Sequence, residues 1–219
     1  MQMNQQDGSQ TKTNLIEAGT RLFGELNGHE VSNRRLAREA GVNHAMVNYH
    51  FGSRDGLCEA IFQHCLTQWK EIMRPIMDHA SSQLDHEPDK RGLGRVADSL
   101  VRGMIEAVTG KEGGRFLAVL LNEDLVSPEQ FYQRLFSDVL EPFHRVASRL
   151  AAAALDQEKE SLASAILGQA IMAQCMTFFR GRVLLMPWLD GQTLDAEKTT
   201  LIADTIVASV RRALALPLE

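Results

Sequence analysis

A short segment of this sequence gathers side chains that can recognise the surface of a nucleic acid. Asn48 can form two hydrogen bonds with the edge of an adenine, and small or apolar groups such as Ala45 and Met46 can contact a thymine methyl group. Tyr49 and His50 can reach phosphate oxygens. These residue types favour recognition of double-stranded DNA over catalysis.

Two short helices are predicted to position these side chains. Ser32 is a good N-cap for the first helix, and Gly41 can adopt the positive φ angle that ends it. Asn43 is expected to cap the second helix, in which Val47 and Phe51, four residues apart, face inward. Two short helices joined by a tight glycine turn are typical of a helix-turn-helix, whose second helix enters the major groove.

The outer face of the second helix is the surface that DNA would contact. A rotation of about 100° per residue places Ala45 and Tyr49 opposite the inward residues, with His44 at the exposed N-terminal end. Arg34 could reach a guanine or the backbone, and Arg54 begins a following helix, where free N–H groups suit a phosphate. The candidate DNA-contacting residues are Ser32, Asn33, Arg34, Asn43, His44, Ala45, Met46, Asn48, Tyr49, His50 and Arg54.

Positive charge is concentrated in this segment. The 219-residue chain has a net charge of −5, which argues against a general nucleic-acid coat. Residues 31–54 nevertheless hold four arginines against a single acidic residue, Glu39. The overall composition, 44% hydrophobic and 23% charged, is that of an ordinary globular protein. The charge distribution therefore suits a local phosphate-facing surface.

Cysteine usage and hydropathy indicate the compartment. Cys58, Cys65 and Cys175 are too few for a disulfide framework or a metal quartet, so we expect buried thiols in a reducing environment. No apolar run approaches the ~20 residues of a membrane span, and the N-terminus MQMNQQDGSQ lacks a signal-peptide pattern. We expect a cytoplasmic protein with no membrane partner.

Hydrophobic periodicity predicts an all-α fold. The predicted helices span residues 11–27, 53–80, 95–108, 114–125, 128–155, 161–186 and 195–214, and residues 81–94 form a linker. Pro75 could kink the second of these long helices, and Pro142 is expected to bend a later one. The predicted boundaries are 1–10 for a disordered N-terminus, 11–52 for the helix-turn-helix domain, 53–80 for a connecting helix and 81–219 for a C-terminal helical bundle.

The sequence resembles the TetR (tetracycline-repressor-like) family of bacterial transcription regulators. The matching segments are a first helix TKTNLIEAGTRLFGELNG, then VSNRRLAREAGV, then VNYHFGSRDGL, and the resemblance is strong over residues 11–69. Further along, LLNEDLVSPEQFYQRLFSDVLEP and GQAIMAQCMTFFRGR resemble the CerR-like C-terminal domain of one subgroup. The resemblance implies a repressor more readily than an activator, with a C-terminal domain for ligand binding and dimerisation.

The last two predicted helices are the candidate dimer interface. The first is rich in small residues and the second carries an apolar stripe, so they could pack closely. The resemblance implies that they pair with their copies in a four-helix interface; an intramolecular core is the alternative. A two-fold dimer could read a pseudo-palindrome with half-sites about 34–36 Å apart, or a multiple of that spacing. The candidate interface residues are Leu162, Ile166, Gly168, Ala170, Ala173, Leu201, Ile202, Ile206 and Val210.

A regulator of this kind usually answers to a signal, and the C-terminal region is large enough to enclose a small-molecule effector. Candidate lining residues combine apolar bulk with isolated polar groups, although residues of these types more often belong to a core or a surface ion pair than to a ligand site. They are Trp69, Phe116, Leu120, Glu123, Phe131, Gln174, Phe178 and Arg180.

Two other functions remain open from the sequence. One is a ligand-independent DNA-binding protein, which a solid C-terminal bundle would favour. The other is an α-helical enzyme, but the GLGRVA segment at residues 92–97 lacks a surrounding βαβ unit, and the Glu141–His144 pair lacks a second metal-binding pair. We expect no metal and no cofactor.

Overall fold

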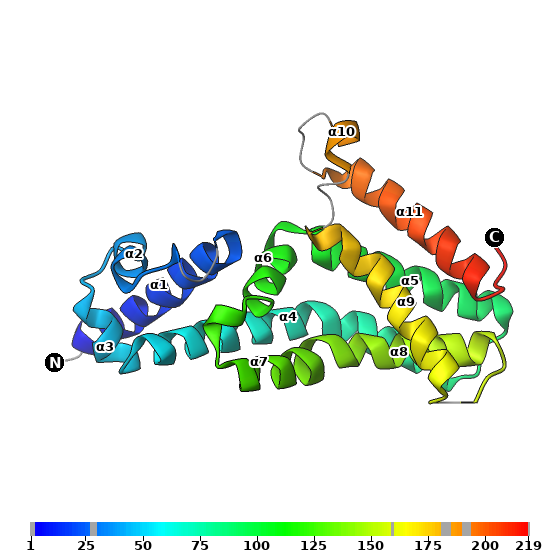
Figure 1. Ribbon diagram of the computed structural model, residues 1–219, viewed down its shortest axis with the longest axis horizontal. Coiled ribbons are helices and arrows are strands. Elements are labelled where there is room, and N and C mark those ends of the chain that lie inside the picture. The colour runs from blue at the N-terminus through cyan, green and yellow to red at the C-terminus, as the bar shows by residue number, and fades with distance from the viewer. Residues whose placement is uncertain (1–2, 27–29, 159, 181–184, 190–193, 219) are drawn as a thin grey trace. The chain divides into compact units, whose positions relative to one another are not determined.

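The computed structural model describes residues 3–26, 30–158, 160–180, 185–189 and 194–218. Helices joined by turns and short loops make up these ranges, and no strand occurs in them (Figure 1). The predicted all-α fold is therefore confirmed.

Four helices carry the predicted DNA-reading segment. They are α1 (Met3–Glu25), α2 (Asn33–Glu39), α3 (Ala45–Phe51) and α4 (Arg54–Asp85). α1 starts earlier than the sequence analysis expects, since residues 3–10 are helical there rather than disordered. Within α1 the Nε2 atom of Gln10 donates to Oδ1 of Asn14 at 2.8 Å, one turn ahead. Elongating a helix adds one backbone hydrogen bond per residue, which explains how a polar segment can extend α1.

The remaining helices follow the predicted order with different ends. They are α5 (Lys90–Thr109), α6 (Lys111–Leu120), η2 (Glu123–Leu125), α7 (Pro128–Arg134), η3 (Leu135–Leu140), α8 (Glu141–Ala154), α9 (Leu162–Arg180), α10 (Met186–Leu189) and α11 (Ala196–Ala213). The predicted linker at 81–94 is shorter, because α4 continues to Asp85 and Asp89 caps α5 by accepting from the backbone N of Gly92 at 2.8 Å.

One predicted helix, residues 128–155, is divided in three. α7 is followed by the π-helical turn η3, and α8 begins with Pro142 in its first turn. Proline has no N–H, so the regular i to i−4 hydrogen bond cannot form at this position. The wider π turn immediately before Pro142 is the local response to that missing donor.

The chain packs as two units, each with its own core. One unit comprises residues 1–70 and 115–139, and the other comprises 71–114 and 140–219. This division differs from the predicted boundary at 80/81, because η2 and α7 pack with the N-terminal helices rather than with the later bundle. A contact 99 residues apart illustrates this: the side-chain amide of Asn122 donates to the carbonyl of Phe23 at 3.4 Å.

Close helix packing holds the second unit together. α8 lies against α9 so tightly that a Cβ atom at Gly168 would come within 2.2 Å of Oγ of Ser148. α11 is fixed to α5 by Arg211, whose guanidinium donates to both carboxylate oxygens of Asp98 at 2.6 Å. Figure 1 shows α11 running beside α5. Such bidentate pairs set orientation as well as distance.

Candidate nucleic-acid interface

Local capping builds the first helix of the helix-turn-helix as predicted. Oγ of Ser32 accepts a hydrogen bond from the backbone N of Arg35 at 3.2 Å, which satisfies one free donor of α2. Leu36 and Ala37 are buried on its inner face. Gly41 has a φ of 68°, the left-handed conformation that ends the helix.

The second helix, α3, is held by one fully buried side chain. The N-cap of α3 is His44 rather than the predicted Asn43, and the His44 side chain forms no capping hydrogen bond. Oδ1 of Asn43 instead accepts from the backbone N of Ala45 at 2.9 Å, and Gly52, with a φ of 74°, ends the helix. Val47 is completely buried, which confirms the predicted inward face. Phe51 is only partly buried, and the ammonium of Lys12 lies 5.7 Å from its ring centroid.

The first turn of α4 contacts both preceding helices, α2 and α3. Oγ of Ser53 caps it by accepting from the backbone N of Gly56 at 3.1 Å. A Cβ atom at Gly56 would lie 2.1 Å from the carbonyl oxygen of Phe51, so this contact between α3 and α4 requires glycine. Nη1 of Arg54 donates to Oδ1 of Asn33 at 3.4 Å, which ties α4 to the start of α2.

Every predicted DNA-contacting residue is accessible. Tyr49 is 78% exposed, a larger fraction than for the other exposed aromatic side chains described in this unit. Its ring lies edge-on to that of His50, with the ring centroids 4.8 Å apart. The exposed members are Ser32, Arg34, Asn43, His44, Ala45, Asn48 and Tyr49, and the partly buried ones are Asn33, Met46, His50 and Arg54. α3 therefore presents a polar and aromatic outer face over a buried valine.

The charge of this surface is more positive than its composition alone indicates. Glu39 is the one acidic residue among residues 31–54, and its carboxylate accepts a hydrogen bond from Arg21 at 3.4 Å. Arg21 lies outside that segment, on α1. The negative charge of Glu39 is therefore paired with an arginine of α1 and not with one of the arginines of α2. Arg34 and Arg38 are exposed on α2 beside the reading helix.

The three cysteines have no role in this surface. All three are buried thiols, as predicted. Burial raises the pKa of Cys65 to about 11 and that of Cys175 to about 12, so both thiols stay protonated at neutral pH. In the part of the chain that the structure describes, no three potential metal ligands come together.

The predicted effector-binding residues are divided between the two units. Trp69, Leu120 and Phe131 are buried, Phe116 packs edge-on to His64 at 6.2 Å, and Glu123 is exposed. The other three predicted residues belong to α9: Gln174 and Phe178 are partly buried, and the side chain of Arg180 lies outside the described residues. Oε1 of Gln174 accepts from Oγ of Ser209 at 2.8 Å, which links α9 to α11.

Most predicted dimer residues are accessible, but two are not. Leu162, Ile166 and Leu201 are 77%, 58% and 67% exposed. Ala170 and Ala173 are also exposed, and Ile202 and Ile206 are partly buried. Gly168 and Val210 lie inside the protomer, because close packing of α9 on α8 and of α11 on its neighbours covers them. Sequence analysis missed Trp188, which is 76% exposed on α10, between the last two predicted helices.

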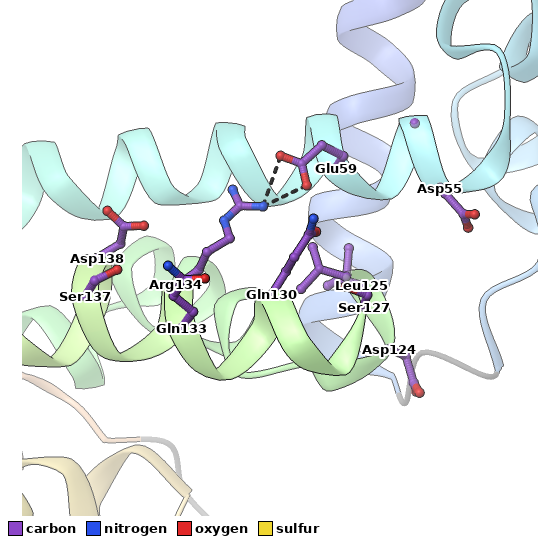
Figure 2. A pocket seen from close by; sticks show the side chains of 12 residues that line it. Asp55, Glu59, Asp124, Leu125, Ser127, Gln130, Gln133, Arg134, Ser137 and Asp138 are labelled. Atoms are coloured by element: carbon purple, nitrogen blue, oxygen red, sulfur yellow. Dashed lines mark hydrogen bonds and ion pairs between the residues drawn. The ribbon is translucent and has the colours of Figure 1, made fainter.

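A groove between α4 and α7 was not predicted. Its volume is about 870 Å³, and Figure 2 shows the lining side chains, with Arg134 of α7 reaching up to Glu59 of α4. The groove is lined by Asp55, Gly56, Glu59, Asp124, Leu125, Val126, Ser127, Gln130, Gln133, Arg134, Ser137 and Asp138. None of the predicted effector residues is among them. The only signal in the sequence was the polar character of the SPEQFYQRLFSD segment.

Two family models match the chain. The model "Bacterial regulatory proteins, tetR family" matches residues 15–61, which contain α2 and α3. The model "HTH-type transcriptional dual regulator CecR, C-terminal domain" matches residues 97–215, more than half of the chain. The matching C-terminal family is named CecR, and this name replaces the expected name CerR-like.

Curated relatives are transcription regulators by name. The chain is 26% identical over 204 residues to the HTH-type transcriptional dual regulator CecR of Shigella flexneri, covering 93% of this chain and 91% of that protein. It is 27% identical over 147 residues to the HTH-type transcriptional regulator BetI of Serratia proteamaculans, covering 64% and 73% of the two chains. These names do not support the enzyme alternative.

Solved structures share the fold. NalD of Pseudomonas aeruginosa, the secondary repressor of the MexAB-OprM multidrug efflux pump, superposes with a TM-score of 0.58 at 19% identity over 94% of this chain and 96% of that one. A protein described as a TetR-family regulator of Mesorhizobium loti gives 0.58 at 14% identity, over 95% and 96%. The chain belongs to the TetR family of bacterial regulatory proteins, in the group with the CecR C-terminal domain, and it is a DNA-binding transcriptional regulator.

Proposed function

We propose that the protein is a homodimeric, cytoplasmic repressor that binds a pseudo-palindromic operator and is released from it by a small molecule. One observation carries the DNA-reading part of this proposal. The polar outer face of α3, including Asn48 and Tyr49, is exposed while Val47 anchors the opposite face in the core. A helix held in this way can enter a major groove without unfolding its own support.

The roles of the exposed side chains follow from their chemistry. Asn48 and His44 offer hydrogen bonds to base edges, and Ala45 can contact a thymine methyl group. Tyr49 offers a hydroxyl, and Arg54 offers a charge at the N-terminal turn of α4, where backbone N–H groups also favour a phosphate. Base contacts set the sequence preference, whereas phosphate contacts set the register and most of the salt dependence.

The dimer part of the proposal is supported by an apolar surface on α9 and α11. We name the exposed residues Leu162, Ile166, Ala170, Ala173 and Leu201 the α9–α11 surface. The expectation that no apolar run approaches the length of a membrane span was wrong: by length and composition, Leu162–Phe179 is long and apolar enough to cross a membrane, and only 28% of it is buried. A second copy of the chain would cover such a helix equally well, and the family match favours this explanation.

The effector part of the proposal has the least direct support. A ligand changes operator affinity only if it binds two conformations of the regulator unequally. We propose that the effector binds the CecR-type C-terminal domain, residues 97–215, which contains all of the eight predicted residues except Trp69. Thermal-shift screening against metabolites and drugs, followed by operator titration, tests this. A compound that binds this domain without changing operator affinity would contradict release by that compound.

Selection of genomic DNA fragments by the purified full-length protein tests the proposed function as a whole. We expect enrichment of fragments that share one inverted repeat, because a two-fold dimer presents two identical reading helices. A parallel selection with the Asn48→Ala/Tyr49→Ala variant is the control, and it should lose that enrichment. Recovery of fragments without a common sequence would instead support the ligand-independent, non-specific alternative.

A further inference from the structure

Two ion pairs join α7 and η3 to α4. Nη1 of Arg134 donates to both carboxylate oxygens of Glu59, at 3.0 and 2.7 Å. The guanidinium also lies over the ring of Phe62, 4.1 Å from its centroid. Nζ of Lys70 donates to Oδ1 of Asp138 at 2.8 Å. We name these two pairs the α4–α7 clamp.

The clamp fixes the axial register of α7 on α4 in both directions. Glu59 and Lys70 are eleven residues apart, roughly 16 Å along α4, whereas Arg134 and Asp138 are only one turn apart, roughly 6 Å. The long side chains of Arg134 and Lys70 bridge this difference. Figure 2 shows Arg134 reaching toward Glu59, with Asp138 on its other side. A slide of α7 along α4 therefore stretches one pair or the other.

Arg134 is the most buried of the four side chains in the clamp. The guanidinium of Arg134 is mostly buried, and its Nη2 atom has no hydrogen-bond partner in the described part of the chain, so Glu59 and Phe62 hold it. Burial raises the pKa of Glu59, but hydrogen bonds from Arg134 and Gln63 outweigh this effect, and the pKa lies below its usual value. Glu59 is therefore ionised at neutral pH.

Glu59 lies one turn from the contacts that hold the reading helix. Gly56, three residues earlier on α4, packs against the carbonyl of Phe51 at the end of α3. Arg54, in the same turn, bonds Asn33 of α2. Physical contact is thus continuous from α7, which lies in the CecR-type region, to both helices of the helix-turn-helix.

We propose that Arg134 is a positioning residue for DNA binding, which acts through Glu59 to hold α4, and with it α3, in the orientation that fits the operator. This inference rests on the proposed DNA-binding function. In this proposal, the Glu59–Arg134 ion pair couples the CecR-type region to α3. Both residues belong to the same packed unit.

A double-mutant cycle on the full-length protein tests the inference. Operator Kd is measured at 10 °C, where circular dichroism must show each variant to be fully folded, for wild type, Arg134→Gln, Glu59→Gln and the double variant. Arg134→Gln and Glu59→Gln should each weaken binding about 10-fold, and the double variant also about 10-fold rather than about 100-fold, since one interaction is lost. Arg149→Gln, which removes the 2.6 Å pair with Asp85 in the other unit, is the matched control and should leave Kd unchanged.

The possible results separate the claims. A purely structural role would lower the melting temperature of Arg134→Gln but leave its Kd at 10 °C equal to that of wild type, and this would overturn the inference. Additive losses, or an equal loss in Arg149→Gln, would overturn it too. If the wild-type protein itself selects no operator, the proposed DNA-binding function is wrong, and the inference that rests on it is wrong as well.

Discussion

Two surfaces of this protein are equally exposed and chemically opposite. Tyr49 on α3 is 78% exposed and Leu162 on α9 is 77% exposed. Next to Tyr49 on α3 are the amide of Asn48 and the imidazole of His50, whereas Ile166, Ala170 and Ala173 follow Leu162 on α9. Exposure alone therefore does not identify a partner. The first surface offers hydrogen bonds and charge that match DNA, and the second offers only apolar area that another protein surface can cover.

The largest expected effect comes from placing a charge on the α9–α11 surface. The variant Leu162→Glu/Ile166→Glu should be monomeric, because a carboxylate in an apolar interface is strongly unfavourable. Operator affinity should fall by roughly 10²–10⁴-fold, since two linked half-site contacts become one. Light scattering and operator titration measure both effects. Leu218→Glu, also at an exposed apolar position but outside this surface, is the control. A dimer that survives the double substitution would show that the interface lies elsewhere.

A smaller effect is expected from removing a phosphate contact. Arg54→Ala should weaken binding to all DNA sequences alike and reduce the slope of log K against log salt by about 1. Tyr49→Ala should weaken binding with a smaller change in slope, because the phenol is uncharged. Titrations at several salt concentrations distinguish the two. An unchanged slope in Arg54→Ala would remove this residue from the proposed phosphate contacts.

Removing a base contact should change preference more than affinity. His44→Ala and Asn48→Ala are each expected to lose about 1–3 kcal/mol of discrimination at one base pair per half-site. Selection from randomised DNA measures this change directly, with a substitution at an exposed position of α1, Ser9→Ala, as the control. Identical preferences in wild type and both variants would mean that α3 does not read bases through these side chains.

The smallest effect is expected from alkylating the thiols. Burial and raised pKa values leave Cys65 and Cys175 as protonated, inaccessible thiols, and desolvation likewise raises the pKa of Cys58. Iodoacetamide at pH 7.5 should modify none of them in the folded protein and all three after unfolding, as mass spectrometry can establish. Rapid modification of the native protein, with loss of DNA binding, would point to a thiol switch.

Features set by neighbours in sequence were predictable, and features set by distant contacts were not. The caps at Ser32 and Ser53, the hydrogen bond that Asn43 accepts, and the glycine turns all depend on residues within a few positions of each other. The Glu59–Arg134 pair joins residues 75 positions apart, and nothing in either local sequence specifies its partner.

The assignment of Gly168 to the dimer interface illustrates the same limit. A small residue on an apolar helix allows close approach of a neighbour, but the sequence does not say which neighbour. In the structure that neighbour is Ser148 of α8 in the same protomer. Leu162 and Ile166 differ because no helix in the described part of the chain covers their side chains, which remain exposed.

Hydroxyl-radical footprinting of the wild-type protein on a selected genomic fragment tests the central claim most directly. The account predicts two protected patches related by a two-fold axis, centred about 34–36 Å apart or at a multiple of that spacing, and both lost in Asn48→Ala/Tyr49→Ala. A single patch, or an unchanged footprint in that variant, would contradict the claim that paired α3 helices read the DNA.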